Sequence, residues 1–447
     1  MYRQFDKSLA MQARFHALIP GGSHTYAKGD DQFPQFMPPY IVKGDGCRVW
    51  DADGNEFMEY GMGLRAVSLG HGFKSVSDAA AKQMYIGNNY TRPATIELEA
   101  AEVFLDTVQF ADMVKFCKNG SDATTAAVKL ARAYTGKTKV ALCKDHPFFS
   151  QDDWFMGTTA IDTGIPQNIK DMSVTFRFDC IGSAKQMFKD NPGEIACVIM
   201  EAEKYTPSQY NFLNEMKALC HEHGALFILD EMITGFRWDI GGAQTFYDFE
   251  PDLSTFGKAM GNGFAISALA GKKEYMELGG IFHDQERVFL LSATHGAENH
   301  ALAAFMEVVN VYKTQDVIPS MNKYGAMLKQ GLIDVIASHG LEKHMQILGR
   351  PVCMVYTTKD QDGNPSQPFR TLFMQECIKR GLLAPNLVIS FSHQEEEVKR
   401  TIEIFDGALE VYKKGLEEGV DKYLVGRSVQ PVYTKKNKPT HIIKSWS

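Results

Sequence analysis

The chain has 447 residues, of which 44% are hydrophobic and 23% charged, a composition typical of a globular protein with two or three domains. Its 47 Lys and Arg against 54 Asp and Glu give a net charge of −7, which argues against a protein that mainly binds nucleic acid or anionic lipid. The 8 cysteines are scattered without a CxxC pair, so we expect free thiols rather than disulfides or a zinc site. No apolar run reaches the roughly 18 residues of a membrane span, and the N-terminal residues lack the apolar core of a signal peptide, which predicts a cytoplasmic protein.

The first 75 residues begin with a helical pattern that ends at the turn Pro20-Gly21-Gly22. Three short strands are predicted after this turn, and Asp53-Gly54 is expected to form the hairpin between the last two. The strands are predicted at 40–42, 48–51 and 56–60. We expect this segment, 1–75, to pack with a smaller domain formed by the C-terminal part of the chain.

From about residue 95 to 300, helical patterns are followed in turn by short apolar runs. Within these runs, polar residues do not alternate with apolar ones. Such runs, separated by helices, are typical of a buried parallel sheet. The helical patterns lie at 95–108 and 123–134, and the apolar runs at 139–142, 196–200 and 226–229. The sequence therefore predicts a large α/β domain over 76–314. A small α+β domain with an extended tail follows over 315–447, with short strands near 354–357 and 387–390.

Two short patterns suggest other chemistry but lack the structural context that it needs. Gly61-Met62-Gly63-Leu64-Arg65-Ala66 fits the dinucleotide pattern G-x-G-x-x-A, yet the helix that should begin there is interrupted at once by 67–72. His221 and His223 are two apart on a predicted helix, roughly 200° around its axis, so they are not expected to share a metal ion.

Three features of the predicted α/β domain point to one active site. The loop 116–122 (FCKNGSD) runs into a helix, where free backbone N–H groups bind anions, although a simple helix cap explains the pattern as well. Asp230 and Glu231 end a buried apolar strand, at the edge where open α/β sheets bind ligands, and a carboxylate buried there needs a cationic partner. Lys258 follows the apolar stretch 253–256 and precedes a glycine-rich turn; taken alone, it would be a solvated surface lysine.

With these features in this order, the chain resembles the class III, fold-type I pyridoxal-phosphate enzymes, and is most similar to glutamate-1-semialdehyde 2,1-aminomutase and its aminotransferase relatives. The resemblance covers roughly residues 10–410. Its motifs are IPGG (19–22), GCRVWDADG (46–54), LGH (69–71), NGSDAT (119–124), LDEMITGFR (229–237), PDLSTFGKAMGNG (251–263) and SFSHQE (390–395). The resemblance implies an α/β fold with a mostly parallel seven-stranded sheet, pyridoxal 5′-phosphate as cofactor, and a homodimer with active sites at the subunit boundary.

The resemblance also implies roles for single residues. Lys258 matches the lysine that forms a Schiff base with the cofactor and then moves a proton between the substrate Cα and the cofactor, for which its amine must be partly neutral near pH 7. Asp230 matches the acid that keeps the pyridinium nitrogen protonated, so that the ring accepts electrons. The other matches that contact the cofactor are Gly120 and Ser121 at the phosphate, Ile233 against one ring face, and Thr294, which resembles a threonine that reaches the phosphate from the neighbouring subunit.

The chain also departs from the family pattern. Phe148 and Phe149 stand where many relatives have Tyr-His, so Phe148 supplies an aromatic face without the phenol, and Glu201 keeps the acid of a Glu-Pro motif. Lys28 stands where the aminomutase has the arginine that binds the substrate carboxylate, while Arg65 appears in a segment that otherwise carries a Trp-Gly pair. An arginine fork suits a carboxylate or phosphate better than lysine does, so we expect Arg65, with Lys28, to bind the substrate anion. The alternative for Arg65 is a structural ion pair.

The sequence thus predicts a pyridoxal-phosphate-dependent aminotransferase that moves an amino group between a small-molecule donor and a carbonyl acceptor through the Lys258 Schiff base and pyridoxamine phosphate. Because the aminomutase arginine is absent, this reaction is preferred to the internal 2,1-shift, which remains the alternative. Racemisation, a nicotinamide oxidoreductase based on Gly61–Ala66, and a non-catalytic relative are further alternatives. The presence of Lys258 and Asp230 argues against the last of these.

Overall fold

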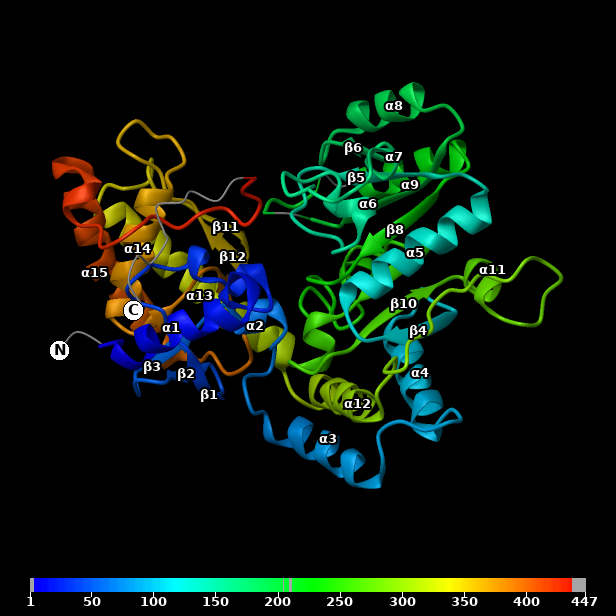
Figure 1. Ribbon diagram of the computed structural model, residues 1–447, viewed down its shortest axis with the longest axis horizontal. Helices are drawn as coiled ribbons and strands as arrows, with labels where there is room; N and C mark the ends of the chain where they lie inside the picture. The colour runs from blue at the N-terminus through cyan, green and yellow to red at the C-terminus, as the bar shows by residue number, and fades with distance from the viewer. Residues whose placement is uncertain (1–3, 204, 209–210, 436–447) are drawn as a thin grey trace. The chain divides into compact units, whose positions relative to one another are not determined.

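The computed structural model of the chain describes residues 4–203, 205–208 and 211–435, and it divides into two compact units (Figure 1). The larger unit comprises Arg65–Ser68 and Phe73–Ile318, and the smaller unit comprises 1–64, 69–72 and 319–447. The domain limits expected from the sequence stay a prediction, and most of the expected tail lies outside the described residues. Within the ranges described, no helix is long and apolar enough to cross a membrane.

The larger unit is built on a seven-stranded sheet with the strand order β4-β10-β9-β8-β7-β5-β6. β10 runs antiparallel to both of its neighbours, and the remaining pairs are parallel. The strands are β4 (Met113–Cys117), β5 (Lys139–Cys143), β6 (Ser173–Phe176), β7 (Ile195–Glu201), β8 (Leu226–Asp230), β9 (Leu253–Phe256) and β10 (Ser267–Gly271). This sheet confirms the predicted α/β class.

Helices cover the sheet of the larger unit. α5 packs against the central strands, and α12 packs against α3 and α4 (Figure 1). The helices are α3 (Lys74–Ile86), α4 (Thr95–Thr107), α5 (Gly120–Thr135), α6 (Asp153–Met156), α7 (Gln167–Lys170), α8 (Ile181–Asp190), α9 (Phe212–Glu222), α10 (Ala243–Phe246), α11 (Lys273–Met276) and α12 (Asn299–Thr314), with the 3-10 turns η4 (Lys258–Gly261) and η5 (Glu277–Gly279).

The sequence explains the central elements of this unit. β7 is an apolar run whose 7 residues are all buried, as expected for a strand covered on both faces. α5 begins at a reciprocal cap, in which the side chains of Asn119 and Asp122 each accept a hydrogen bond of 3.2 Å from the backbone N–H of the other. It ends at Gly136, whose left-handed φ of 68° suits glycine. The cap formed by Asn119 and Asp122 therefore fixes the end of α5 that follows β4.

The smaller unit combines segments from both ends of the chain. Its sheets have the orders β1-β2-β3-β13 and β11-β12-β14, and β3 pairs in parallel with β13. The strands are β1 (Ile41–Asp45), β2 (Arg48–Asp51), β3 (Glu56–Glu59), β11 (Ile347–Arg350), β12 (Cys353–Tyr356), β13 (Leu382–Leu383) and β14 (Leu387–Val388). The helices are α1 (Asp6–Leu18), α13 (Val317–Ser338), α14 (Gln367–Lys379) and α15 (Glu395–Glu418), with η1 (Pro20–Gly22), η2 (Tyr26–Lys28), η3 (Asp30–Gln32) and η6 (Val420–Lys422). The helical turn α2 (Met62–Arg65) leads from β3 towards the larger unit.

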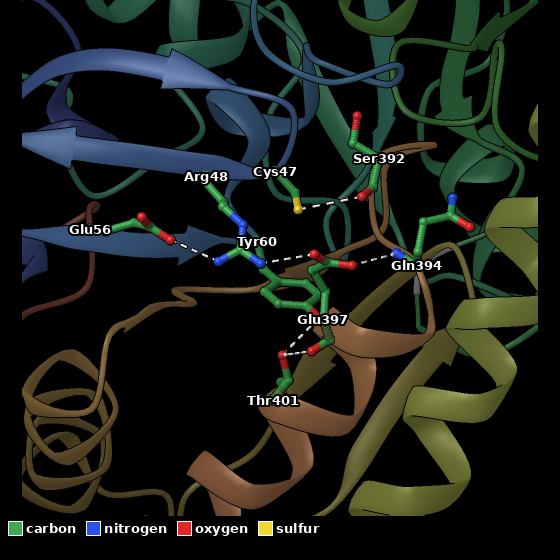
Figure 2. Close-up of polar contacts among 8 residues, drawn as sticks. All are labelled: Cys47, Arg48, Glu56, Tyr60, Ser392, Gln394, Glu397 and Thr401. Carbon is green, nitrogen blue, oxygen red and sulfur yellow. Dashed lines mark hydrogen bonds and ion pairs between the residues drawn. The ribbon is translucent and has the colours of Figure 1, made fainter.

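A network of polar side chains joins the early and late segments of the smaller unit (Figure 2). Arg48 donates to Glu56 at 2.7 Å and to Glu397 at 3.0 Å, so one guanidinium links β2, β3 and α15. The buried hydroxyl groups of Tyr60 and Thr401 lie 2.9 Å apart. The contacts of Arg48 with Glu397 and of Tyr60 with Thr401 each join residues more than 340 positions apart, which explains how the two ends of the chain form one unit.

Candidate active site

Three neighbouring parallel strands end with polar side chains at the same edge of the larger sheet. Glu201 of β7 is the register partner of Asp230 of β8, and Asp230 is the register partner of Thr255 of β9. β4 points in the same direction as β9, because both run antiparallel to β10 between them. The loop that follows Cys117 therefore leaves the sheet at this edge, where open α/β sheets bind their ligands.

Lys258 follows β9 at this edge and begins η4. Its backbone has the left-handed φ of 47°, an uncommon conformation for a residue with a side chain. Burial lowers the pKa of its amine, Asp230 and Glu201 oppose this effect, and the positive charges of Arg65 and Arg237 add to it. Among the described residues, no hydrogen bond or ion pair engages its Nζ. The structure thus presents a partly buried amine whose surroundings favour its neutral form.

Two buried carboxylates stand at the end of β8. Asp230 is 1% exposed and accepts a hydrogen bond of 2.8 Å from the backbone N–H of Met232. Burial raises the pKa of Asp230 above its usual range, and the charge of Lys258 opposes the rise. Glu231 accepts bonds of 2.8 Å from the backbone N–H groups of Ala243 and Gln244, and burial raises its pKa to about 7. Glu231 holds the loop between β8 and α10, whereas Asp230 remains at the strand end.

The start of α5, which is the predicted anion cradle, lies beside these strands. Gly120 and Ser121 occupy the first turn, where backbone N–H groups have no acceptor within the helix. A Cβ at Gly120 would lie 2.9 Å from Sδ of Met232, so the backbone approaches the loop after β8 as closely as glycine permits. The Ser121 hydroxyl accepts a 3.0 Å bond from the N–H of Gln151 and so ties the cradle to the loop after β5.

That loop carries Phe148, one of the predicted cofactor contacts. Phe148 is 46% exposed, and its ring packs edge-on against Phe155 with centroids 5.5 Å apart. The next residue, Phe149, is buried, and its carbonyl accepts a 2.9 Å bond from the hydroxyl of Thr124 on α5. An aromatic face is thus held beside the anion cradle.

Two further predicted residues lie on the same side of the unit. The backbone N–H of Glu201 donates to Nδ1 of the buried His146 at 3.1 Å. Ile233 lies in the loop after β8, and its carbonyl accepts a 3.2 Å bond from Arg237. The structure therefore groups Glu201 and Ile233 with Asp230, while their contacts with a cofactor stay a prediction.

Arg65 also belongs to the larger unit, and its charge lies close enough to Lys258 to lower the pKa of that amine. The turn Met62–Arg65 has left-handed φ values throughout, from 42° to 71°. The regular helix required by the dinucleotide reading of Gly61–Ala66 is therefore absent from this described stretch, and that alternative is wrong in its structural premise.

Two predicted residues are not joined to this group. Thr294 is exposed, and its carbonyl accepts a 2.9 Å bond from the side chain of Asn89. Lys28 is exposed at the end of η2 in the smaller unit. Their roles stay predictions.

Arg237, whose side chain is fully buried in the larger unit, was not among the residues predicted for the site. It donates to the carbonyl groups of Ile233 and Arg65, and so connects the loop after β8 with the segment that carries Arg65. The sequence offered one signal for a buried role of Arg237, which is its position between the aromatic residues Phe236 and Trp238. A charged residue in such a place requires buried polar partners.

Pyridoxal 5′-phosphate, the cofactor expected from the resemblance, fits the groups at this edge. The amine of Lys258 is available, the Asp230 carboxylate is buried, and the N–H groups of Gly120 and Ser121 suit a phosphate. A Cβ at Gly257 would lie 2.7 Å from both Met232 and Ser267, so a larger residue before the lysine would require these side chains to move. In the described ranges, no group of three or more His, Cys, Asp or Glu side chains is placed to hold a metal ion.

Comparisons with known proteins agree with this fit. The sequence model of the family "Aminotransferase class-III" matches residues 26–405. The chain is 28% identical to glutamate-1-semialdehyde 2,1-aminomutase of Caldicellulosiruptor saccharolyticus over 430 residues, which covers 92% of this chain and 100% of that protein. The PLP internal aldimine form of the Sphingopyxis sp. MTA144 FumI protein superimposes with a TM-score of 0.83 at 27% identity, covering 92% of this chain and 97% of the other. An omega-transaminase from Sphaerobacter thermophilus shares the fold, with a TM-score of 0.81 at 23% identity and coverage of 92% and 98%.

Proposed function

The chain belongs to the class-III aminotransferase family, whose cofactor is pyridoxal 5′-phosphate, and we propose that it transfers an amino group between separate donor and acceptor molecules. The observation that carries this proposal is the partly buried, available amine of Lys258 beside the buried Asp230 carboxylate. Amino transfer needs a base whose amine can lose its proton, and the surroundings of Lys258 lower the pKa of its amine in this direction.

When bound, the cofactor supplies an electron sink that stabilises negative charge at the substrate Cα. Lys258 takes the proton from Cα and returns it, since its amine has no competing partner among the described residues. Asp230 holds a negative charge for the ring nitrogen, and Gly120 with Ser121 holds the phosphate. Phe148 and Ile233 are proposed for the two faces of the ring, with Glu201 beside it. These assignments rest on the resemblance and on the grouping of the residues in the larger unit.

Arg65 is our candidate for binding the substrate carboxylate or phosphate. Its charge lies near the Lys258 amine, and a bidentate contact to a buried anion contributes on the order of 1.5–3 kcal/mol. Arg65→Ala should therefore raise KM for the anionic substrate by roughly 10–100-fold, while Arg65→Lys recovers part of the affinity. If Arg65→Ala instead lowers the melting temperature and leaves KM unchanged, the residue is a structural ion pair. Lys28 is a second candidate for this role, from the sequence alone.

The experiment that tests the proposal is a screen of ¹⁵N-labelled amino donors against carbonyl acceptors. Amino transfer predicts that the label leaves the donor and appears in a different molecule, and that the donor alone stops after one turnover. Lys258→Ala protein is the control for reactions that occur without the enzyme. The absence of label transfer for donors of every class, with cofactor bound, would contradict the proposal.

The second candidate is the internal amino shift of glutamate-1-semialdehyde, because curated relatives at 28–29% identity are named as that aminomutase. This activity predicts continuous formation of 5-aminolevulinate from glutamate-1-semialdehyde without any added acceptor. One measurement separates the two candidates. The rate of amino transfer should depend on a second carbonyl compound, whereas the rate of the internal shift should not.

We also propose a cytoplasmic homodimer with shared active sites. Large apolar side chains of the larger unit are exposed, including Tyr85 at 94%, Phe282 at 88% and Phe289 at 72%, and such exposure marks interaction surfaces. Sedimentation analysis should show a dimer, and Phe282→Glu should weaken it.

A further inference from the structure

The turn that leads to Arg65 has an unusual backbone. Met62, Gly63, Leu64 and Arg65 have φ values of 42°, 59°, 61° and 71°, so the chain makes one left-handed turn. This conformation costs roughly 1–2 kcal/mol for each residue that carries a side chain. It persists only where surrounding contacts fix it.

Two hydrogen bonds fix the segment after this turn within the larger unit. Nη2 of Arg237 donates to the carbonyl oxygen of Arg65, and the buried hydroxyl of Ser68 donates to the carbonyl oxygen of Ala259 at 3.3 Å. Ala259 directly follows Lys258. The segment that carries Arg65 is therefore anchored once to the loop after β8 and once beside the lysine.

Arg237 is itself held firmly. Its Nη1 donates to the carbonyl of Ile233 at 3.2 Å, and the carbonyl of the preceding Phe236 accepts a 2.8 Å bond from the hydroxyl of Tyr312 on α12. The Arg237 side chain is 0% exposed, so no ligand reaches it. Apart from the effect of its charge on the pKa of Lys258, Arg237 therefore acts on a substrate through the residues that it positions.

We infer that Arg237 is a positioning residue, which fixes the backbone of Arg65 and thereby sets the affinity for an anionic substrate. The inference rests on the proposed function, because it takes Arg65 as the group that binds the anion. It adds that this binding depends on a guanidinium that never contacts the substrate.

The experiment is a double-mutant cycle on the holoenzyme with glutarate, a dicarboxylate that has neither an amino nor a keto group. Calorimetry measures its dissociation constant for the unaltered enzyme, Arg237→Lys, Arg65→Ala and the double variant. Arg237→Lys keeps the charge but loses the fork, so it should weaken glutarate binding about tenfold through misplacement of Arg65. In the Arg65→Ala background, the same substitution should have no further effect.

Folding is checked by the melting temperature of each variant. If Arg237→Lys does not fold, Ser68→Ala tests the same inference at the other anchor, and should weaken glutarate binding in the unaltered background only. Arg132→Lys is the matched control, because Nε of Arg132 donates to the carbonyl of Thr138 at 2.8 Å at the far end of α5. This control should leave glutarate binding unchanged.

Equal weakening by Arg237→Lys in both backgrounds, or normal glutarate binding by well-folded Arg237→Lys protein, would overturn the inference. Normal glutarate binding by Arg65→Ala would overturn both the role of Arg65 and the inference. Absence of amino transfer by the unaltered enzyme contradicts the proposed function separately, since glutarate binding requires no turnover.

Discussion

The two units each contain a network of charged and polar side chains, but they use the hydrogen bonds of these groups differently. In the smaller unit, Arg48 is paired with Glu56 and Glu397, and Glu397 also accepts a 3.1 Å bond from the N–H of Gln394 (Figure 2). Each charge has an opposite charge or a donor. Such mutual pairing holds chain segments together and leaves little capacity for a ligand.

At the strand ends of the larger unit, the pairing is incomplete. The Lys258 amine has a lowered pKa and no hydrogen bond in the described chain, while burial raises the pKa of Asp230 and of Glu231. Burial without full pairing is unfavourable for a structure, and it is the environment in which catalytic groups acquire the pKa values that they need. The ion pairs of the smaller unit are partly exposed and fully partnered, so buried carboxylates together with an amine that has no partner among the described residues distinguish the candidate site.

The largest expected effect comes from removing the available lysine. Lys258→Ala should reduce turnover by at least about 10³-fold, because no other amine can act at that position, while circular dichroism and the melting temperature stay near those of the unaltered protein. Lys139→Ala is the matched control, since Lys139 lies on the same sheet but at the start of β5, where its amine bonds to Asn191 at 2.7 Å. More than about a hundredth of the rate retained by Lys258→Ala would refute the assignment.

Asp230→Asn removes the negative charge but keeps the shape. Cofactor should still bind, as its visible absorbance will show, but single-turnover proton removal at the substrate Cα should slow by roughly 10²-fold or more. Asp252→Asn is the control, because Asp252 is also buried and accepts a 2.7 Å bond from the N–H of Phe227, but it lies at the start of β9. An unchanged single-turnover rate for Asp230→Asn would show that the carboxylate is structural, as in the smaller unit.

Glu231 allows the cost of burying a carboxylate at this edge of the sheet to be measured as stability. Burial raises its pKa to about 7 from the ordinary 4.5, so the folded state keeps a proton that the unfolded state has lost. The stability from this group is present below about pH 4.5 and is lost as the pH rises through about 7. Between about pH 5 and pH 8, the unaltered protein should therefore lose on the order of 3 kcal/mol relative to Glu231→Gln, measured by urea unfolding. Parallel pH profiles for the two proteins would show that Glu231 is ionised throughout.

The sequence predicted the central strands of the fold because they are covered on both faces and consist of unbroken apolar runs. β5, β7 and β8 lie at the predicted runs with shifts of one residue. β4, β6 and β10 were not predicted. β4 and β6 are the outer strands of the sheet and carry partly exposed positions that disrupt the apolar pattern. β10 is fully buried, but its sequence SALAG consists mostly of small residues and does not form an apolar run.

The strand-end residues of the site could be anticipated for a related reason. Asp230 directly ends an apolar run, and Lys258 stands between a short apolar stretch and a glycine-rich turn. The contact of Arg237 with Arg65 joins positions 172 residues apart, and no local pattern encodes it. The left-handed turn at Met62–Arg65 was hidden because Met, Leu and Arg rarely adopt this conformation, so only tertiary contacts could impose it.

The smallest expected effect is in the paired network of the smaller unit. Glu397→Ala removes the partner of Arg48 and the side chain that caps the first turn of α15. Loss of a cap and of a charged hydrogen bond costs about 1–3 kcal/mol, so the protein should unfold at a lower urea concentration. Turnover below that transition should be unchanged, since the larger unit carries the proposed chemistry.

Glu403→Ala is the matched control, because its 2.8 Å pair with Arg400 is exposed on the same helix and should contribute almost nothing. If Glu397→Ala reduced kcat as strongly as stability, the division between a structural and a reactive network would be wrong.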